Sequence, residues 1–307
     1  MSKDSSKKDS SVERHISSEM LRSDAHVPKS TLRFGARISN KLHHLTKRPA
    51  RAEIKDQKDD VRKPWVHPIG AVLIVLFIYF ASQIIGGLLL SVYPALHHWS
   101  DSQANDWVNN SVVAQFIYVV VAEGLTLLSL WAFLRHFKIS LGEIGLKRAK
   151  GEDVLYALSG FALYFVSYAV LLSILMKFIP SLNVNQPQQI GFQTASGFGQ
   201  LAMTAISLVI LPPIAEEILM RGFLYSSLRR SMPKIGAALV TSILFATAHL
   251  EFGEGAPLLW VAAIDTFVLS LVLILLREKT DRLWASMGVH GLKNTIAFIS
   301  LFIFHTH

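Results

Sequence analysis

Seven long apolar stretches restrict this chain more than any other feature of its sequence. They cover residues 68–92, 112–134, 154–178, 199–213 with a continuation beyond, 235–251, 257–276 and 283–304. A helix needs about 20 apolar residues to cross the hydrocarbon core of a bilayer. Because backbone polar groups have no water to bond there, spanning segments must satisfy them internally. The chain is therefore predicted to be an all-α, multi-pass transmembrane helical bundle with about seven spans.

The charged residues are concentrated at the N-terminus. Residues 1–64 hold 16 of the 30 Lys and Arg and 9 of the 22 Asp and Glu, a net charge of +7 out of +8 for the whole chain. Such a polar segment cannot bury enough apolar surface to offset chain entropy. We interpret it as a disordered basic tail, followed by N-terminal transmembrane helices at 65–198 and a transmembrane core at 199–307. We expect membrane lipids as partners and no nucleic acid.

Lys and Arg also alternate between the loops that join the apolar stretches. The loops at 93–111 and 179–198 contain none, whereas the loop at 135–153 contains five. Cytoplasmic loops carry an excess of these residues. The pattern predicts a cytoplasmic N-terminus and a tail that lies in the cytoplasm.

The fourth stretch contains adjacent prolines at positions 212 and 213. A proline inside a helix removes a hydrogen-bond donor and clashes with the preceding turn. We therefore expect a helix up to residue 211, a break, and a second helix from about residue 214. Broken helices at membrane depth are tolerated where they are buried in protein or line a wet cavity. A functional site is predicted directly after Pro213.

Ionisable residues follow these prolines, and such residues inside a membrane are functional candidates. Glu217 and Arg221 have the i, i+4 spacing of a helical ion pair, with the acid first. Glu216 faces another side of the helix and lacks that partner. An unpaired carboxylate in an apolar segment suits a general base. We predict Glu216 as the catalytic acid and base, and Glu217–Arg221 as the pair that supports its helix.

Two further helices carry candidate residues with the same spacing. Phe245 and His249 are i and i+4, so the ring of Phe245 is expected to limit rotation of the imidazole. His290 and Asn294 are also i and i+4 and offer two directed donors. Donors aimed at a developing oxyanion stabilise acyl-transfer transition states. With a carboxylate and a histidine to hold water, the set could cleave a peptide bond.

These residues resemble three motifs of the CAAX protease and bacteriocin-processing family of intramembrane proteases (CPBP, Abi-type). This family includes the type II CAAX prenyl endopeptidases. Residues 216–222, Glu-Glu-Ile-Leu-Met-Arg-Gly, are similar to its E-E-x-x-x-R motif. Residues 245–249, Phe-Ala-Thr-Ala-His, and 290–294, His-Gly-Leu-Lys-Asn, are similar to its F-x-x-x-H and H-x-x-x-N motifs. Residues 139–148 resemble the segment that often precedes the family core.

The resemblance implies a role for each residue. Glu216 with His249 would activate the water, and His290 with Asn294 would stabilise the oxyanion. The implied activity is cleavage of a peptide or a prenylated protein by an intramembrane endopeptidase. The family and the charge pattern together indicate the cytoplasmic membrane of a bacterium.

A metal ion is the open alternative for this chemistry. Glu and His bind zinc, so Glu216, His249 and His290 are the predicted ligands if a metal is present. The chain has no cysteine and no H-E-x-x-H motif, and asparagine is an unusual ligand. We expect a metal-independent glutamate mechanism without a cofactor, although the family has often been labelled as metalloprotease.

Two other functions compete with the protease. One is a non-catalytic membrane scaffold or bacteriocin-immunity protein, which the intact motifs disfavour. The other is a transporter that uses the interrupted fourth helix as an ion site. No second broken helix at a matching position indicates an inverted repeat, so this hypothesis ranks last.

Overall fold

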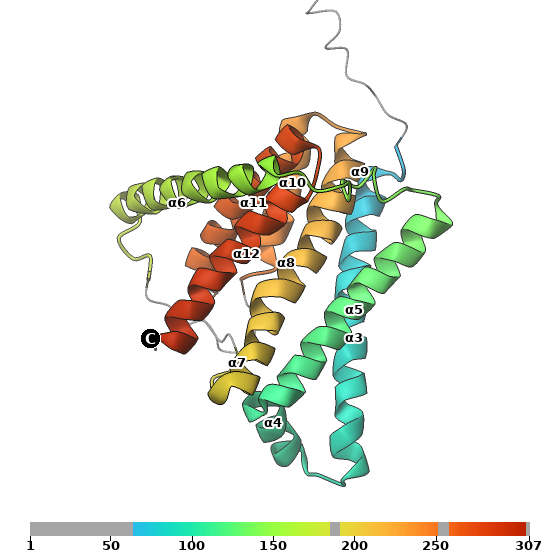
Figure 1. Ribbon diagram of the computed structural model, residues 1–307, viewed down its shortest axis with the longest axis vertical. Coiled ribbons are helices and arrows are strands. Elements are labelled where there is room, and N and C mark those ends of the chain that lie inside the picture. Colours follow the sequence, from blue (N-terminus) through green and yellow to red (C-terminus); the bar gives the residue numbers. More distant parts are fainter. Residues whose placement is uncertain (1–63, 185–190, 251–257, 305–307) are drawn as a thin grey trace, which may run out of the picture. The chain divides into compact units, whose positions relative to one another are not determined.

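The computed structural model describes residues 64–184, 191–250 and 258–304. The predicted N-terminal tail lies outside these ranges, apart from Pro64. Within them all regular elements are helices and no strand is found (Figure 1). The first helices are α3 (Pro68–Leu96), α4 (Asp101–Asn110), α5 (Val112–His136) and α6 (Glu152–Phe178); the later ones are α10 (Lys234–Thr247), α11 (Trp260–Thr280) and α12 (Trp284–Phe298), which π-helix η3 (Ile299–Ile303) extends.

Five helices are long and apolar enough to cross a membrane. They are α3, α5, α6, the composite helix Gly197–Arg229 and α11. The predicted all-α membrane fold is confirmed, but the count of seven spans is not. The apolar stretch at 235–251 forms only the 14-residue helix α10, and α12 is not among the five spans.

The composite helix corrects the predicted break at the two prolines. It consists of α7 (Gly197–Ala205), η1 (Ile206–Ile210), α8 (Leu211–Glu216), η2 (Glu217–Tyr225) and α9 (Ser226–Arg229), without an interruption. The segment η1 is π-helical, and the N–H of Leu211 bonds to the carbonyl of Ile206. A wider turn of this kind gives room to a proline ring that would clash in a regular helix. The prolines therefore distort the helix and do not divide it.

The composite helix lies between two groups of helices. On one side, α3 packs along α5, and both contact the composite helix. On the other side, α6, α11 and α12 pack against one another through Tyr164, Leu269, Leu273 and Val289. Figure 1 shows α8 between α5 and α12. Ala215 and Glu217 are fully buried in this bundle, and Glu216 between them is partly buried, with its side chain 23% exposed.

The loop between α5 and α6 is fixed on the bundle by its backbone. Ile144 is fully buried, and the N–H of Leu283 donates to the carbonyl of Gly145 at 3.1 Å. Gly145 has a φ of +91°, and a Cβ there would lie 2.7 Å from Nε of Arg277. Only glycine combines this backbone conformation with that close approach. The absence of a side chain at Gly145 thus lets Arg277 pack directly against the backbone of this loop, residues 137–151.

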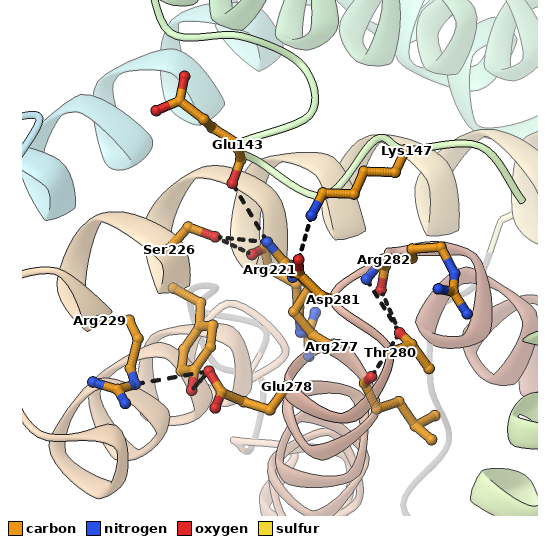
Figure 2. Close-up of polar contacts among 12 residues, drawn as sticks. Glu143, Lys147, Arg221, Ser226, Arg229, Arg277, Glu278, Thr280, Asp281 and Arg282 are labelled. Carbon is orange, nitrogen blue, oxygen red and sulfur yellow. Dashed lines mark hydrogen bonds and ion pairs between the residues drawn. The ribbon is translucent and has the colours of Figure 1, made fainter. Parts of the chain in front are cut away.

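Charged side chains then join this loop to α11 and to the end of the composite helix (Figure 2). Arg277 binds Asp281 at 2.8 Å, and Lys147 forms a second ion pair with the same carboxylate. Arg277 also donates to Oγ of Ser226 at 3.4 Å, and the hydroxyl of Ser226 donates to the carbonyl of Arg221 at 3.3 Å. A continuous set of contacts therefore leads from the loop to the helix that carries the candidate site.

Candidate active site

Three helices and one turn supply the predicted residues. Glu216 is the last residue of α8, and Glu217 and Arg221 lie in η2. Phe245 is in α10, and His249 follows it in the turn after that helix. His290 and Asn294 are in α12. Residues that are far apart in the sequence thus approach one another through helix packing.

Glu217 and Arg221 form the ion pair that their spacing predicts. Oε1 of Glu217 lies 2.9 Å from Nη1 of Arg221, and neither side chain is exposed. The guanidinium also lies over the ring of Phe245, 4.2 Å from its centroid. A cation over an aromatic face is stabilised, most strongly where water is excluded. Phe245 therefore contacts Arg221 as well as the histidine with which it was grouped from the sequence.

Glu217 has a second partner that the sequence did not reveal. Nδ1 of His290 lies 3.1 Å from the same Oε1. A carboxylate in an ion pair accepts hydrogen bonds, so Nδ1 is assigned as the donor. The partner thus fixes the ring, and Nε2 of His290 points toward Glu216. The side chain of His290 is 5% exposed.

Glu216 lies beside this histidine without a hydrogen-bond partner on one oxygen. Its Oε2 is 3.7 Å from Nε2 of His290, which is longer than a hydrogen bond. Oε2 itself is buried and unpartnered, although the side chain as a whole is 23% exposed. A buried oxygen of this kind normally has a polar partner, frequently water. The gap therefore suits a water molecule or a polar group of a substrate.

His249 is held by its own helix. Its Nδ1 donates to the carbonyl of Phe245 at 2.8 Å, and the two rings pack edge to face with centroids 4.8 Å apart. The ring of Phe245 also packs edge to face against His290 at 5.9 Å. Phe245 thus contacts both histidines, and Nε2 of His249 is the ring nitrogen left for another partner. The structure does not join His249 to Glu216 by a hydrogen bond.

Asn294 contacts the composite helix one turn away from His290. Its Nδ2 donates to the backbone carbonyl of Leu208 at 2.8 Å. The predicted pair of His290 and Asn294 therefore shares one helix face, but the two side chains bind different partners in this structure.

The chain was compared with known protein families, with curated proteins and with solved structures. Residues 198–296 match the family model described as type II CAAX prenyl endopeptidase Rce1-like. The family resemblance is confirmed. No curated protein and no solved structure shows significant similarity. The match covers about a third of the chain, contains all of the candidate residues described above, and supports an intramembrane CAAX-type protease at the level of the family.

A further ion pair lies next to the candidate site. Lys293 binds Oδ2 of Asp265 at 2.8 Å, and the hydroxyl of Tyr164 donates to the other oxygen of that carboxylate. The pair links α6, α11 and α12. Lys293 also interacts electrostatically with Glu216 and both histidines, and Glu123 on α5 interacts with Glu216. Neither Asp265 nor Glu123 belongs to the three sequence motifs.

Zinc is the alternative predicted for Glu216, His249 and His290. Zinc sites take three or four ligands about 2 Å from the ion, with geometry close to tetrahedral. Across the part of the chain that the structure describes, no three His, Asp or Glu side chains are grouped to hold a metal ion. Nδ1 of each histidine bonds to a protein acceptor, which leaves Nε2 as the nitrogen that a metal could bind. We derive no catalytic step through a metal.

Sequence spacing identified the contacts within each helix and missed those between helices. The Glu217–Arg221 pair and the contact of Phe245 with His249 follow from the i, i+4 rule. The bond between Glu217 and His290 joins residues 73 positions apart, so no local pattern could show it. The bond from Asn294 to Leu208 did have a signal, because two adjacent prolines leave a carbonyl without a helical donor.

Proposed function

We propose that the chain is an intramembrane endopeptidase that cleaves peptide or prenylated protein substrates. The observation that carries this proposal is the unpartnered Oε2 of Glu216, 3.7 Å from Nε2 of His290. A water that lies beside the line joining these two atoms could bond to both of them. The family match supports the choice of peptide hydrolysis among the reactions that such a pair could catalyse.

In the proposed reaction, Glu216 acts first as base and then as acid. Its Oε2 takes a proton from the water as the water oxygen attacks the substrate carbonyl. The C–N bond of the tetrahedral intermediate then breaks, and the same proton passes to the leaving amine. Proton transfer of this kind contributes about 10²- to 10⁴-fold to a rate. His290 lies where its Nε2 can share this proton with Glu216.

Glu217 positions His290 in this scheme and does not touch the substrate. Its Oε1 binds Nδ1 of His290, and Arg221 holds the carboxylate in turn. An imidazole whose far nitrogen is fixed keeps one tautomer and one orientation. The two adjacent glutamates therefore receive different roles, because they face different sides of one helix.

The proposed setting is the cytoplasmic membrane of a bacterium, with the N-terminus in the cytoplasm. Contacts among three basic segments support their location on the same side of the membrane. Arg230 binds Glu143 at 3.1 Å, Lys147 pairs with Asp281, and Lys234 binds Glu278 at 3.2 Å. The contacts bring the loop after α5, the end of the composite helix and the end of α11 together, as the positive-inside rule requires for cytoplasmic loops.

Cleavage of fluorogenic peptides by the purified protein in liposomes tests the proposal. The panel contains prenylated and unprenylated peptides, and His290→Gln is compared with wild type at equal folded amounts. We expect wild type to cleave at least one peptide and His290→Gln to lose most of that activity. Equal cleavage by the two proteins would contradict the role of the Glu216–His290 pair.

A chelator arm on the same panel separates the glutamate mechanism from a metal enzyme. The glutamate mechanism predicts unchanged activity with chelator. Loss on chelation and recovery with zinc would instead make Glu216, His249 and His290 metal ligands. If wild type cleaves no peptide, and His290→Gln retains the cellular phenotype of wild type, a non-catalytic scaffold replaces the protease.

A further inference from the structure

The carbonyl of Leu208 has no possible donor within its own helix. In an α-helix, a carbonyl accepts from the N–H four residues later, and in a π-helix from the N–H five residues later. For Leu208 these positions are Pro212 and Pro213, and proline has no N–H. The N–H of the preceding residue, Leu211, bonds to Ile206 instead. Both helical registers therefore leave this carbonyl unsatisfied.

An unsatisfied carbonyl at membrane depth is strongly unfavourable, because no lipid group can donate to it. The side chain of Asn294 supplies the missing donor: its Nδ2 donates to the carbonyl oxygen of Leu208 at 2.8 Å. Asn294 belongs to α12, which packs against η1. At the next position along η1, a Cβ on Gly291 would lie 3.6 Å from the carbonyl of Val209, so α12 approaches the helix backbone closely there.

The contact is placed to control the geometry of the candidate site. Glu216 follows Pro212 by four residues, and His290 precedes Asn294 by four residues. The same two helices are joined again by the bond between Glu217 and His290 at 3.1 Å. Packing against α6 and α11 places α12 in the bundle, and the two bonds add directed contacts to the composite helix. Together these contacts fix the position of Nε2 of His290 relative to Glu216.

We infer that Asn294 is a positioning residue that holds α12 in register with the Glu216 helix by bonding the carbonyl that Pro212 and Pro213 leave free. This inference rests on the proposed function for its effect on catalysis, and on the helix geometry alone for its effect on stability. It differs from the role that the family resemblance implies, in which Asn294 donates to the oxyanion of the substrate.

Restoring the helical donor distinguishes the two roles. An alanine at position 212 provides an N–H four residues after Leu208, so the carbonyl no longer needs Asn294. We would measure kcat, KM and the unfolding temperature of wild type, Asn294→Ala, Pro212→Ala and the double variant. Thr295→Ala is the matched control, since its hydroxyl bonds only within α12, to the carbonyl of Gly291.

If Asn294 is a positioning residue, the effect of Asn294→Ala should depend strongly on which residue stands at position 212. Asn294→Ala should lower the unfolding temperature and reduce kcat by about 10²-fold, the effect of a misplacement of about 1 Å. In the Pro212→Ala background the same substitution should change kcat by less than about 10-fold and leave the unfolding temperature nearly unchanged. Thr295→Ala should match wild type in both measurements.

An oxyanion donor predicts the opposite pattern. Its removal reduces kcat by about 10²- to 10³-fold whatever residue stands at position 212, and that result would overturn the inference. If Pro212→Ala does not fold, Pro213→Ala supplies the donor five residues after Leu208 and replaces it in the cycle. If wild type cleaves nothing, the proposed function fails, but the unfolding temperatures still decide whether Asn294 serves the carbonyl.

Discussion

At the scale of single residues, the two adjacent glutamates differ by their partners and not by their chemistry. Glu217 is fully buried and uses Oε1 for both Arg221 and His290, whereas Glu216 lies 3.7 Å from His290 and bonds to neither residue; Oε2 has no hydrogen-bond partner in either carboxylate. Removing one member of a buried ion pair leaves the other charged and unpaired. We therefore expect Glu217 to contribute to stability as well as to the orientation of His290, and these two contributions can be separated by mutation.

Glu217→Gln leaves the guanidinium of Arg221 buried without its counter-ion. We expect it to lower the free energy of unfolding by about 3–5 kcal/mol, measured by thermal or denaturant unfolding in detergent. The double variant Glu217→Leu/Arg221→Met replaces the pair by apolar side chains and should recover most of that stability. It should still cleave about 10²-fold more slowly than wild type, because His290 has lost the acceptor that positions it.

The same double variant can contradict the two roles assigned to Glu217. Wild-type activity in the stable double variant would mean that Glu217 serves only the fold. A double variant as unstable as Glu217→Gln would mean that the loss does not come from the unpaired guanidinium.

At the scale of elements, the sequence predicted where helices form better than how they are distorted. The apolar runs placed α3, α5, α6 and α11, but the prolines suggested a break where η1 provides a wider turn. The polar helix α4 was not predicted, although Ser100 and Gln103 form a capping box at its start. Bond donors from other helices, such as Asn294, decide between a break and a distortion, and local sequence does not contain them.

Close packing of α6 on α11 and α12 depends on Gly160. A Cβ there would lie 2.7 Å from Cδ1 of Leu276 and 3.1 Å from Cγ2 of Val289. Gly160→Val should therefore overpack this contact and destabilise the protein by about 1–3 kcal/mol, measured by unfolding. Gly87→Ala is the control, because a Cβ at Gly87 meets no atom within 4 Å. Equal stability of Gly160→Val and wild type would show that α6 is not packed this closely.

The loop of residues 137–151 should make stability depend on pH. Burial raises the pKa of Asp281, but the bonds from Lys147 and Arg277 outweigh it and hold the pKa below its ordinary value. The backbone N–H of Ser140, with help from Arg230, likewise lowers the pKa of Glu143. In each case the unfolded chain binds the proton first as the pH falls. The ion pairs therefore stabilise the fold at neutral pH.

Unfolding measured between pH 7 and pH 3 tests this dependence. Stability should be lost as the pH falls below the ordinary carboxylate values of about 4, toward the lowered values of the folded state. Asp281→Asn and Glu143→Gln together should reduce the slope of stability against pH in that range. An unchanged slope would show that the carboxylates of Asp281 and Glu143 do not contribute to it.

At the scale of the whole molecule, the sequence predicted the fold class but neither the number of spans nor the contacts between helices. The need for apolar helices of about 20 residues made the fold class readable. It did not fix the number of spans, because the stretch at 235–251 ends as a helix at Thr247. The site residues could be predicted from the sequence because they are ionisable residues within apolar segments. Their partners across helices, such as His290 for Glu217, follow only from the packed bundle.

The most direct test of the account is the turnover of Glu216→Gln on a peptide that wild type cleaves, with the folded fraction of each sample measured. Glutamine keeps the size of the side chain but cannot take a proton from water. The account predicts a decrease in kcat of about 10²- to 10⁴-fold, while Asp106→Asn on the exposed helix α4 retains wild-type turnover. A Glu216→Gln protein that remains within about threefold of wild type would contradict it, because the proton would then have another acceptor.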